Sequence, residues 1–262
     1  MELEVIKRLP KTPTQKPPIV FIHGAFIGAI CWDVHFLPYF AKQGYPAYAV
    51  SLRGHGKSGG NLRSASIQDY VEDIASITLN LEEAPIIVGH SMGGMVAQRY
   101  MEQYPCQAVI LMNSVSPNGI NSSAFYMSLT DPLLFQQFGV LQSFGTHFIN
   151  PVAMKRALFS PNMPDEKVEE YFTYMQNESH QAVLDLLNLE MPPHRPTNIP
   201  MLVLGAENDV FFPPAIVYWT ASTHRADMKI FPKTAHGMML ELNWQSVADY
   251  ILNWLDKQKL AK

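Results

Sequence analysis

Residues 85–94 read Pro-Ile-Ile-Val-Gly-His-Ser-Met-Gly-Gly, and this stretch decides the fold. The short apolar run before the first glycine is typical of a buried strand, and residues 92–104 have the apolar spacing of a helix that must end before Pro105. Between them lies a Gly-x-Ser-x-Gly turn, in which the two glycines remove the Cβ atoms that would clash. The stretch therefore predicts a strand, a sharp strained turn centred on Ser91, and a helix.

Strand patterns and helix patterns alternate on both sides of this turn. Apolar runs predict further strands at residues 18–23, 46–52, 107–112, 199–204 and 228–231. Helical spacing and end signals predict helices at residues 32–43, 66–84, 213–223 and 244–257. Strands that alternate with helices pair in parallel through right-handed crossovers, so the pattern predicts an α/β fold with a mostly parallel central sheet flanked by helices.

The alternation breaks off between the two halves of this pattern. Residues 116–198 contain no strand pattern and consist of helical pieces that prolines and glycines interrupt. The simplest interpretation is a core made of residues 1–115 and 199–262, with residues 116–198 inserted as a helical cap.

Composition limits the classes of protein. The 262 residues are 47% apolar and 16% charged, which suits a globular chain, and the net charge of -4 gives no indication of nucleic-acid binding. No apolar run approaches the ~18 residues of a membrane span and no signal segment is visible, so we expect a cytoplasmic protein without stable membrane insertion. The only cysteines, Cys31 and Cys106, are expected to be buried and reduced, and no histidine–carboxylate spacing suggests a metal.

Later loops supply the partners that a reactive serine needs. A serine hydroxyl is too weak an acid to attack unaided, so a histidine base and an orienting carboxylate must lie beside Ser91. His236 and Asp209 each follow a predicted later strand, where the ends of parallel strands meet. Glu207 competes with Asp209, which lies deeper in its loop and is preferred. The alternative position after the strand that ends at residue 112 carries no carboxylate in residues 113–116.

Backbone N–H groups near Ser91 can hold a developing oxyanion. The start of the helix offers Met92, and the turn after the first central strand offers Ala25, with Phe26 as the second choice. That turn can also be read as a plain strand ending. His23 and His90 are expected to brace these loops through hydrogen bonds, without acting as bases.

These motifs resemble the α/β-hydrolase superfamily, in its single-chain bacterial esterase and lysophospholipase-like branch. The resemblance rests on the His-Gly at 23–24, on Leu-Arg-Gly-His-Gly-Lys-Ser-Gly at 52–59, on the turn at 89–94, on Asp209, and on Thr-Ala-His-Gly at 234–237. It implies the fold named above and no metal or organic cofactor. It also implies that haloalkane dehalogenase and epoxide hydrolase chemistry is absent, because those relatives carry aspartate at the position of Ser91.

Aromatic and methionine side chains crowd residues 116–198. Some must bury the cap helices against the core, and others can line a slot for an apolar acyl or aryl group. Phe26, Phe211 and Met238 flank the predicted site and are candidate substrate-binding residues, although the same side chains can equally belong to the core.

The sequence therefore predicts a serine hydrolase that cleaves carboxylic esters with a hydrophobic acyl or aryl part, through an acyl-enzyme intermediate. Its expected partner is a small hydrophobic ester. Thioesterase, lactonase, carbon–carbon bond hydrolase and hydroxynitrile lyase activities remain open as alternatives. A binding or receptor module that keeps the fold with little turnover is the alternative outside enzymology.

Overall fold

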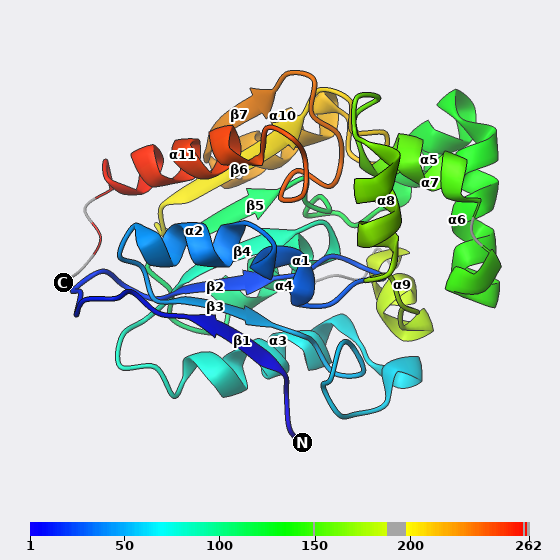
Figure 1. Ribbon diagram of the computed structural model, residues 1–262. Helices are drawn as coiled ribbons and strands as arrows, with labels where there is room; N and C mark the ends of the chain where they lie inside the picture. The colour runs from blue at the N-terminus through cyan, green and yellow to red at the C-terminus, as the bar shows by residue number, and fades with distance from the viewer. Residues whose placement is uncertain (149, 188–197, 259, 261–262) are drawn as a thin grey trace.

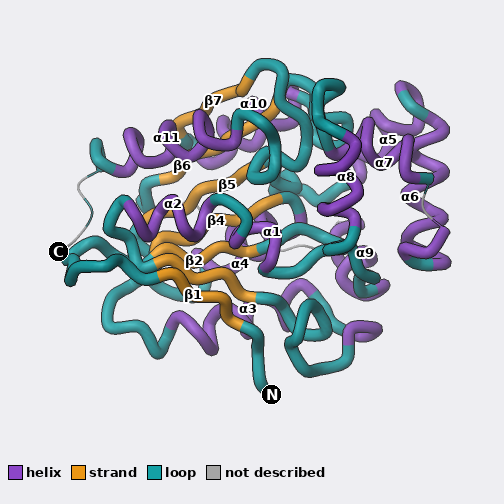
Figure 2. The backbone as a smooth tube through the Cα atoms, in the orientation of Figure 1, coloured by secondary structure: helices purple, strands orange, loops and turns teal. Residues whose placement is uncertain are grey.

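The computed structural model describes residues 1–148, 150–187, 198–258 and 260. Its centre is one seven-stranded sheet in the order β1-β3-β2-β4-β5-β6-β7 (Figures 1 and 2). The strands are β1 (Val5–Arg8), β2 (Ile19–Ile22), β3 (Ala47–Val50), β4 (Ile86–His90), β5 (Ala108–Met112), β6 (Met201–Ala206) and β7 (Asp227–Phe231). All neighbours pair in parallel except β1 and β3. The predicted mostly parallel sheet is confirmed.

Strand β1 is an element that the sequence analysis did not assign. It pairs antiparallel with β3 at the edge of the sheet, and its last two residues, Lys7 and Arg8, are exposed. An edge strand has a neighbouring strand on one side only, and this one has four residues. It lacks the continuous apolar run of the central strands, so its sequence pattern does not identify it as a strand.

Helices cover both faces of the sheet. One face carries α1 (Ile30–Asp33), α2 (Phe36–Lys42) and α11 (Trp244–Leu255), and the other carries α3 (Ile67–Thr78), α4 (Met92–Met101) and α10 (Pro214–His224). Successive strand residues point to opposite faces, so Phe21 packs on Trp32 while Val20 joins Tyr70 and Met95.

The single helix predicted at residues 32–43 is wrong, because the chain forms α1 and α2 with a break between them. His35 leaves the helical conformation at φ -136°, and its ring stacks on Trp244 with 4.6 Å between centroids. The capping box predicted before α3 is confirmed, since Ser66 and Asp69 exchange side-chain and backbone hydrogen bonds. However, α3 ends at Thr78, before the predicted residue 84.

Between β5 and β6 the chain forms α5 (Asn121–Thr130), α6 (Pro132–Phe144), the 3-10 turn η2 (Thr146–Phe148), α7 (Pro151–Leu158), α8 (Asp165–Phe172) and α9 (His180–Leu187). These elements, called the cap helices below, gather beside the carboxyl ends of the parallel strands, at the right of Figure 1. Residues 149 and 188–197 of the predicted cap lie outside the described residues. None of the helices in the described ranges is both long and apolar enough to cross a membrane.

Candidate active site

Ser91 lies on a strained turn between β4 and α4. Its backbone adopts φ 54° and ψ -119°, a region that non-glycine residues rarely occupy, and its N–H donates to the carbonyl of Met112 on β5 at 3.1 Å. A Cβ on Gly89 would lie 2.3 Å from the carbonyl oxygen of Gly93, and one on Gly93 would lie 2.4 Å from the carbonyl oxygen of His23. The glycines therefore allow the close backbone contacts that hold the turn.

A buried histidine–carboxylate pair lies beside this turn. His236 Nδ1 is 2.8 Å from Asp209 Oδ2, and the other carboxylate oxygen of Asp209 accepts the N–H groups of Phe211 and Phe212 at 2.8 and 3.0 Å. With Nδ1 bound to the carboxylate, Nε2 is the ring nitrogen left for other chemistry. Ser91 and His236 both line one cavity, and Asp209 stands behind the histidine.

The competing carboxylate, Glu207, faces a different direction. It is exposed, and its Oε2 accepts the backbone N–H of Lys233 at 2.9 Å. The structure thus brings Asp209, the preferred residue, against His236.

The carbonyl of His236 is fixed from behind by two side chains. His90 Nε2 and Asn113 Nδ2 each lie 2.9 Å from this oxygen and donate to it. Burial and the neighbouring His236 lower the pKa of His90 well below its usual range, so His90 is a neutral donor. The expected bracing role of His90 is confirmed. The role of Asn113 was missed, because the sequence analysis searched this position for a carboxylate.

His23 braces the loop after β2, in which a Cβ on Gly24 would lie 3.0 Å from the Cβ of Ser91. Its Nε2 accepts the N–H of Leu52 at 3.0 Å, and its Nδ1 donates to the carbonyl of Gly24 at 2.8 Å. Burial, with a smaller contribution from His55, lowers the pKa of His23 to about 3. The ring is therefore neutral and structural, which confirms the bracing role expected for His23.

The predicted oxyanion donors occupy the cavity wall. Ala25 and Met92 both line the cavity, and their N–H groups donate to no acceptor among the described residues. By contrast, the N–H of Phe26 donates to a carboxylate oxygen of Glu178 at 3.2 Å. This leaves Ala25, the first choice, as the available donor of the loop.

Glu178, in the link between α8 and α9, is a buried site residue that the sequence analysis missed. Besides Phe26, it accepts hydrogen bonds from Tyr70 at 2.7 Å and from the N–H of Ser179 at 2.7 Å, and it lies 3.0 Å from His55 Nε2. Burial alone would raise the pKa of Glu178, but His55 and these donors outweigh it and lower the pKa. Its partners are more than 100 residues away, apart from Ser179, so no local sequence signal marks it.

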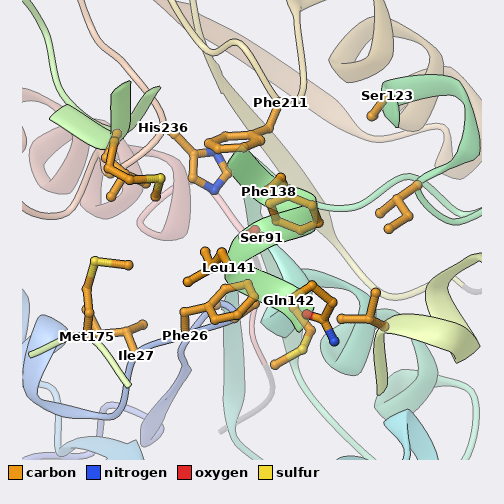
Figure 3. Close-up of a pocket in the computed structure, with 18 of the residues that line it drawn as sticks. Phe26, Ile27, Ser91, Ser123, Phe138, Leu141, Gln142, Met175, Phe211 and His236 are labelled. Atoms are coloured by element: carbon orange, nitrogen blue, oxygen red, sulfur yellow. The ribbon is translucent and has the colours of Figure 1, made fainter. Parts of the chain in front are cut away.

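A largely apolar cavity of about 690 Å³ is lined by Ser91 and His236 and by residues of α5, α6 and α7. Figure 3 shows both catalytic candidates among its wall residues. Its volume lies within the usual range of small-molecule sites. Phe26 and Phe211 line it, as the sequence analysis expected, and the ring of Phe211 lies 4.8 Å from that of His236.

The expectation that Met238 lines the cavity is wrong. Met238 is fully buried in the hydrophobic core between the sheet and the helices α2 and α11. Its neighbour Met239 lines the cavity instead. The backbone turns tightly after His236, with the N–H of Met238 donating to the carbonyl of His236 at 2.9 Å, and a sequence pattern does not reveal which methionine of such a turn reaches the cavity.

The two thiols differ in exposure. Cys31 is buried at the cavity wall, whereas Cys106 is only partly buried, contrary to expectation. Burial raises the pKa of both thiols, that of Cys106 to about 12. Within the described ranges, no cluster of three or more His, Cys, Asp or Glu side chains could hold a metal ion.

Comparisons with known proteins show similarity to hydrolases and related enzymes. The chain is 32% identical over 109 residues to a bifunctional esterase/perhydrolase of Acinetobacter calcoaceticus, covering 40% of this chain and 39% of the relative. It is 32% identical over 114 residues to a non-heme chloroperoxidase of Streptomyces lividans, covering 42% and 41%. The matched parts thus span less than half of the curated relatives.

The fold as a whole matches solved structures. A thermophilic esterase from Thermogutta terrifontis superimposes with a TM-score of 0.74 at 19% identity, over 97% of this chain and 93% of the other. A sequence model described as the alpha/beta hydrolase family matches residues 19–250, which include every predicted site residue. On this match, the chain belongs to the alpha/beta hydrolase family.

Proposed function

We propose that the protein hydrolyses carboxylic esters with a hydrophobic acyl or aryl part, through an acyl-enzyme intermediate on Ser91. The observation that carries the proposal is the shared cavity: Ser91 on its strained turn and His236, whose ring Asp209 holds from behind, line one apolar space. The esterase named among the similar sequences supports the same reaction class.

In the acylation step, the hydroxyl of Ser91 attacks the ester carbonyl while His236 Nε2 takes its proton. Asp209, held by two backbone N–H groups, keeps the ring oriented and stabilises the imidazolium that forms. The N–H groups of Ala25 and Met92 stabilise the oxyanion, and donors of this kind are each worth about 2.7–4 kcal/mol of barrier.

The intermediate then collapses as the alcohol leaves with the proton from His236. A water molecule, deprotonated by the same nitrogen, attacks the acyl carbon and releases the acid, which restores Ser91. No further group is needed to balance these steps.

The direct test is the Ser91→Ala variant assayed with p-nitrophenyl butyrate. We expect turnover to vanish, because the nucleophile is gone, whereas Ser222→Ala on the exposed side of α10 should keep wild-type turnover. A Ser91→Ala enzyme with full activity would refute the scheme.

A panel then resolves the reaction class. Wild-type kcat/KM values for matched esters, thioesters, lactones, a carbon–carbon bond substrate and a cyanohydrin are compared, and the proposal expects the esters to rank first. Covalent labelling of Ser91 by a fluorophosphonate without turnover of any panel member would instead indicate a binding module. The lysophospholipase-like assignment predicts that long-chain monoacyl lipids rank among the accepted esters.

A further inference from the structure

Two polar side chains of the cavity have no hydrogen-bond partner in the part of the chain that the structure describes. Gln142 on α6 and Ser123 on α5 both line the apolar space, and Figure 3 draws them among its wall residues. Both amide atoms of Gln142, Nε2 and Oε1, are buried and have no hydrogen-bond partner among the described residues. The same holds for the hydroxyl of Ser123, a residue that is only 5% exposed.

Such groups are costly in an apolar setting. Buried polar atoms in folded proteins are nearly always hydrogen-bonded, because burial removes the water that would otherwise satisfy them. Asp209 and Glu178 follow the rule, since their oxygens are occupied. His90 Nδ1 and Asn113 Oδ1 also lack a partner among the described residues, but each of these side chains donates a hydrogen bond through its other polar atom. Gln142 and Ser123 are the side chains lining the cavity in which every polar atom is buried and lacks a described partner. The exceptions at Gln142 and Ser123 are therefore places where a bound molecule gains hydrogen bonds without displacing a protein partner.

The chemistry of the wall limits what that molecule offers. Among the described residues that line the cavity there is no lysine, arginine, aspartate or glutamate. A charged substituent would thus be buried without a counter-charge, which is strongly unfavourable. The amide N–H of Gln142 and the hydroxyl of Ser123 can each donate to a neutral carbonyl oxygen, and the amide oxygen can accept from a hydroxyl.

We infer that Gln142 forms a polar subsite that selects esters whose hydrophobic acyl part carries an uncharged oxygen substituent such as a ketone, and that Ser123 is a separate polar contact on the same cavity wall. The inference rests on the proposed ester hydrolysis and names its substrate class. Apolar wall residues such as Leu141 and Phe138 hold the carbon chain, and the subsite sets which chain is preferred. A plain alkyl chain would leave Gln142 unpaired and is the poorer substrate.

The test compares p-nitrophenyl octanoate with its 3-oxo, 5-oxo and 7-oxo derivatives. We expect the wild type to prefer at least one oxo ester after correction for its uncatalysed reactivity. Gln142→Leu should lower kcat/KM for that ester at least tenfold and leave or raise kcat/KM for the octanoate. Ser123→Ala should act in the same direction more weakly. The control is Gln181→Leu, which makes the same change at an exposed glutamine outside the cavity and should keep the wild-type ratio.

A second readout avoids turnover. The Ser91→Ala variant should bind the preferred oxo ester at least tenfold more tightly than the octanoate, and adding Gln142→Leu should remove the difference. The inference is overturned if Gln142→Leu changes all four esters equally, or leaves every ratio within twofold in both assays. Loss of the proposed function looks different, because then the wild type turns over none of the esters, while the binding comparison still reports on Gln142.

Discussion

At the scale of single residues, the site depends on where a side chain points within a loop. Asp209 and Glu207 are two residues apart after β6, yet one meets His236 and the other meets the backbone of Lys233. The two N–H groups that follow Asp209 turn its carboxylate inward. The sequence identifies the loop and its two acids, but the geometry of the loop backbone determines which of them contacts His236.

This difference predicts unequal effects of neutralising the two acids. Asp209→Asn should lower kcat by about 10⁴, because an amide favours the wrong histidine tautomer. Glu207→Gln is the matched control and should keep kcat within a fewfold. Steady-state assays with p-nitrophenyl butyrate, together with circular dichroism to verify folding, provide the measurement. Similar losses in the two variants would contradict the assignment of the acid.

Other residue-scale features lay beyond the sequence for the same reason. Met238 and Met239 are equivalent in a pattern, but only Met239 reaches the cavity. The sequence left Phe26 open as the second choice of donor after Ala25, and only the structure shows that the N–H of Phe26 is taken by Glu178. Ser91, His236 and Asp209 were predictable because mechanism and strand ends together restrict their positions.

At the scale of elements, one carboxylate ties the cap helices to the core. Glu178 links the segment between α8 and α9 to His55, to Tyr70 on α3 and to the loop of Phe26. The parallel strands were readable from their apolar runs, whereas this tie joins positions far apart in the chain. The contacts of Glu178 form only when the cap helices pack against the core, so a sequence pattern does not indicate them.

Breaking the tie should affect both stability and turnover. Glu178→Ala leaves buried donors unpaired, and we expect the free energy of unfolding to fall by about 3 kcal/mol, as measured by urea denaturation. Because the loop that carries Ala25 is released, kcat should fall as well. The control, Glu170→Ala on the exposed face of α8, should leave the urea midpoint unchanged. An unaltered midpoint for Glu178→Ala would show that the tie carries no stability.

Two helical glycines give opposite predictions. Apart from its chain neighbours and the backbone of its own helix, no heavy atom of the described residues lies within 4 Å of the place that a Cβ on Gly139 in α6 would take. Gly139→Ala should therefore raise the free energy of unfolding by about 0.5–1 kcal/mol through helix propensity. Gly93→Ala in α4 should lower it, because the new methyl group would meet backbone oxygens at 2.4 and 2.5 Å. Thermal denaturation of the two variants checks both signs, and a stabilised Gly93→Ala would contradict the packing of the turn.

At the scale of the whole molecule, buried neutral histidines make stability depend on pH. His23 has a folded pKa of about 3 against the ordinary histidine pKa of 6.5, so the unfolded chain binds one more proton between these pH values. Stability is therefore retained above pH 6.5 and lost as the pH falls towards 3. The folded pKa of Glu178 is also lowered, from 4.5 in the unfolded chain, so protonation of Glu178 further reduces stability as the pH falls below 4.5.

We expect the free energy of unfolding to fall by about 1.4 kcal/mol per pH unit for each such histidine below pH 6.5. Urea denaturation at pH 7, 6, 5 and 4 measures this slope. His23→Gln should flatten it, and His180→Gln, at an exposed position, should not. A wild-type curve that is level from pH 7 to pH 4 would contradict the neutral burial of His23.

The positive φ of Ser91 lowers the free energy of unfolding of the native protein. Glycine adopts φ 54° without steric cost, whereas alanine keeps the Cβ that opposes it. Both Ser91→Gly and Ser91→Ala remove the hydroxyl, yet the glycine variant should be the more stable by about 1 kcal/mol, partly offset by the freedom of glycine in the unfolded chain. The native protein is then less stable than its fold allows, and this loss of stability arises at the φ torsion of Ser91.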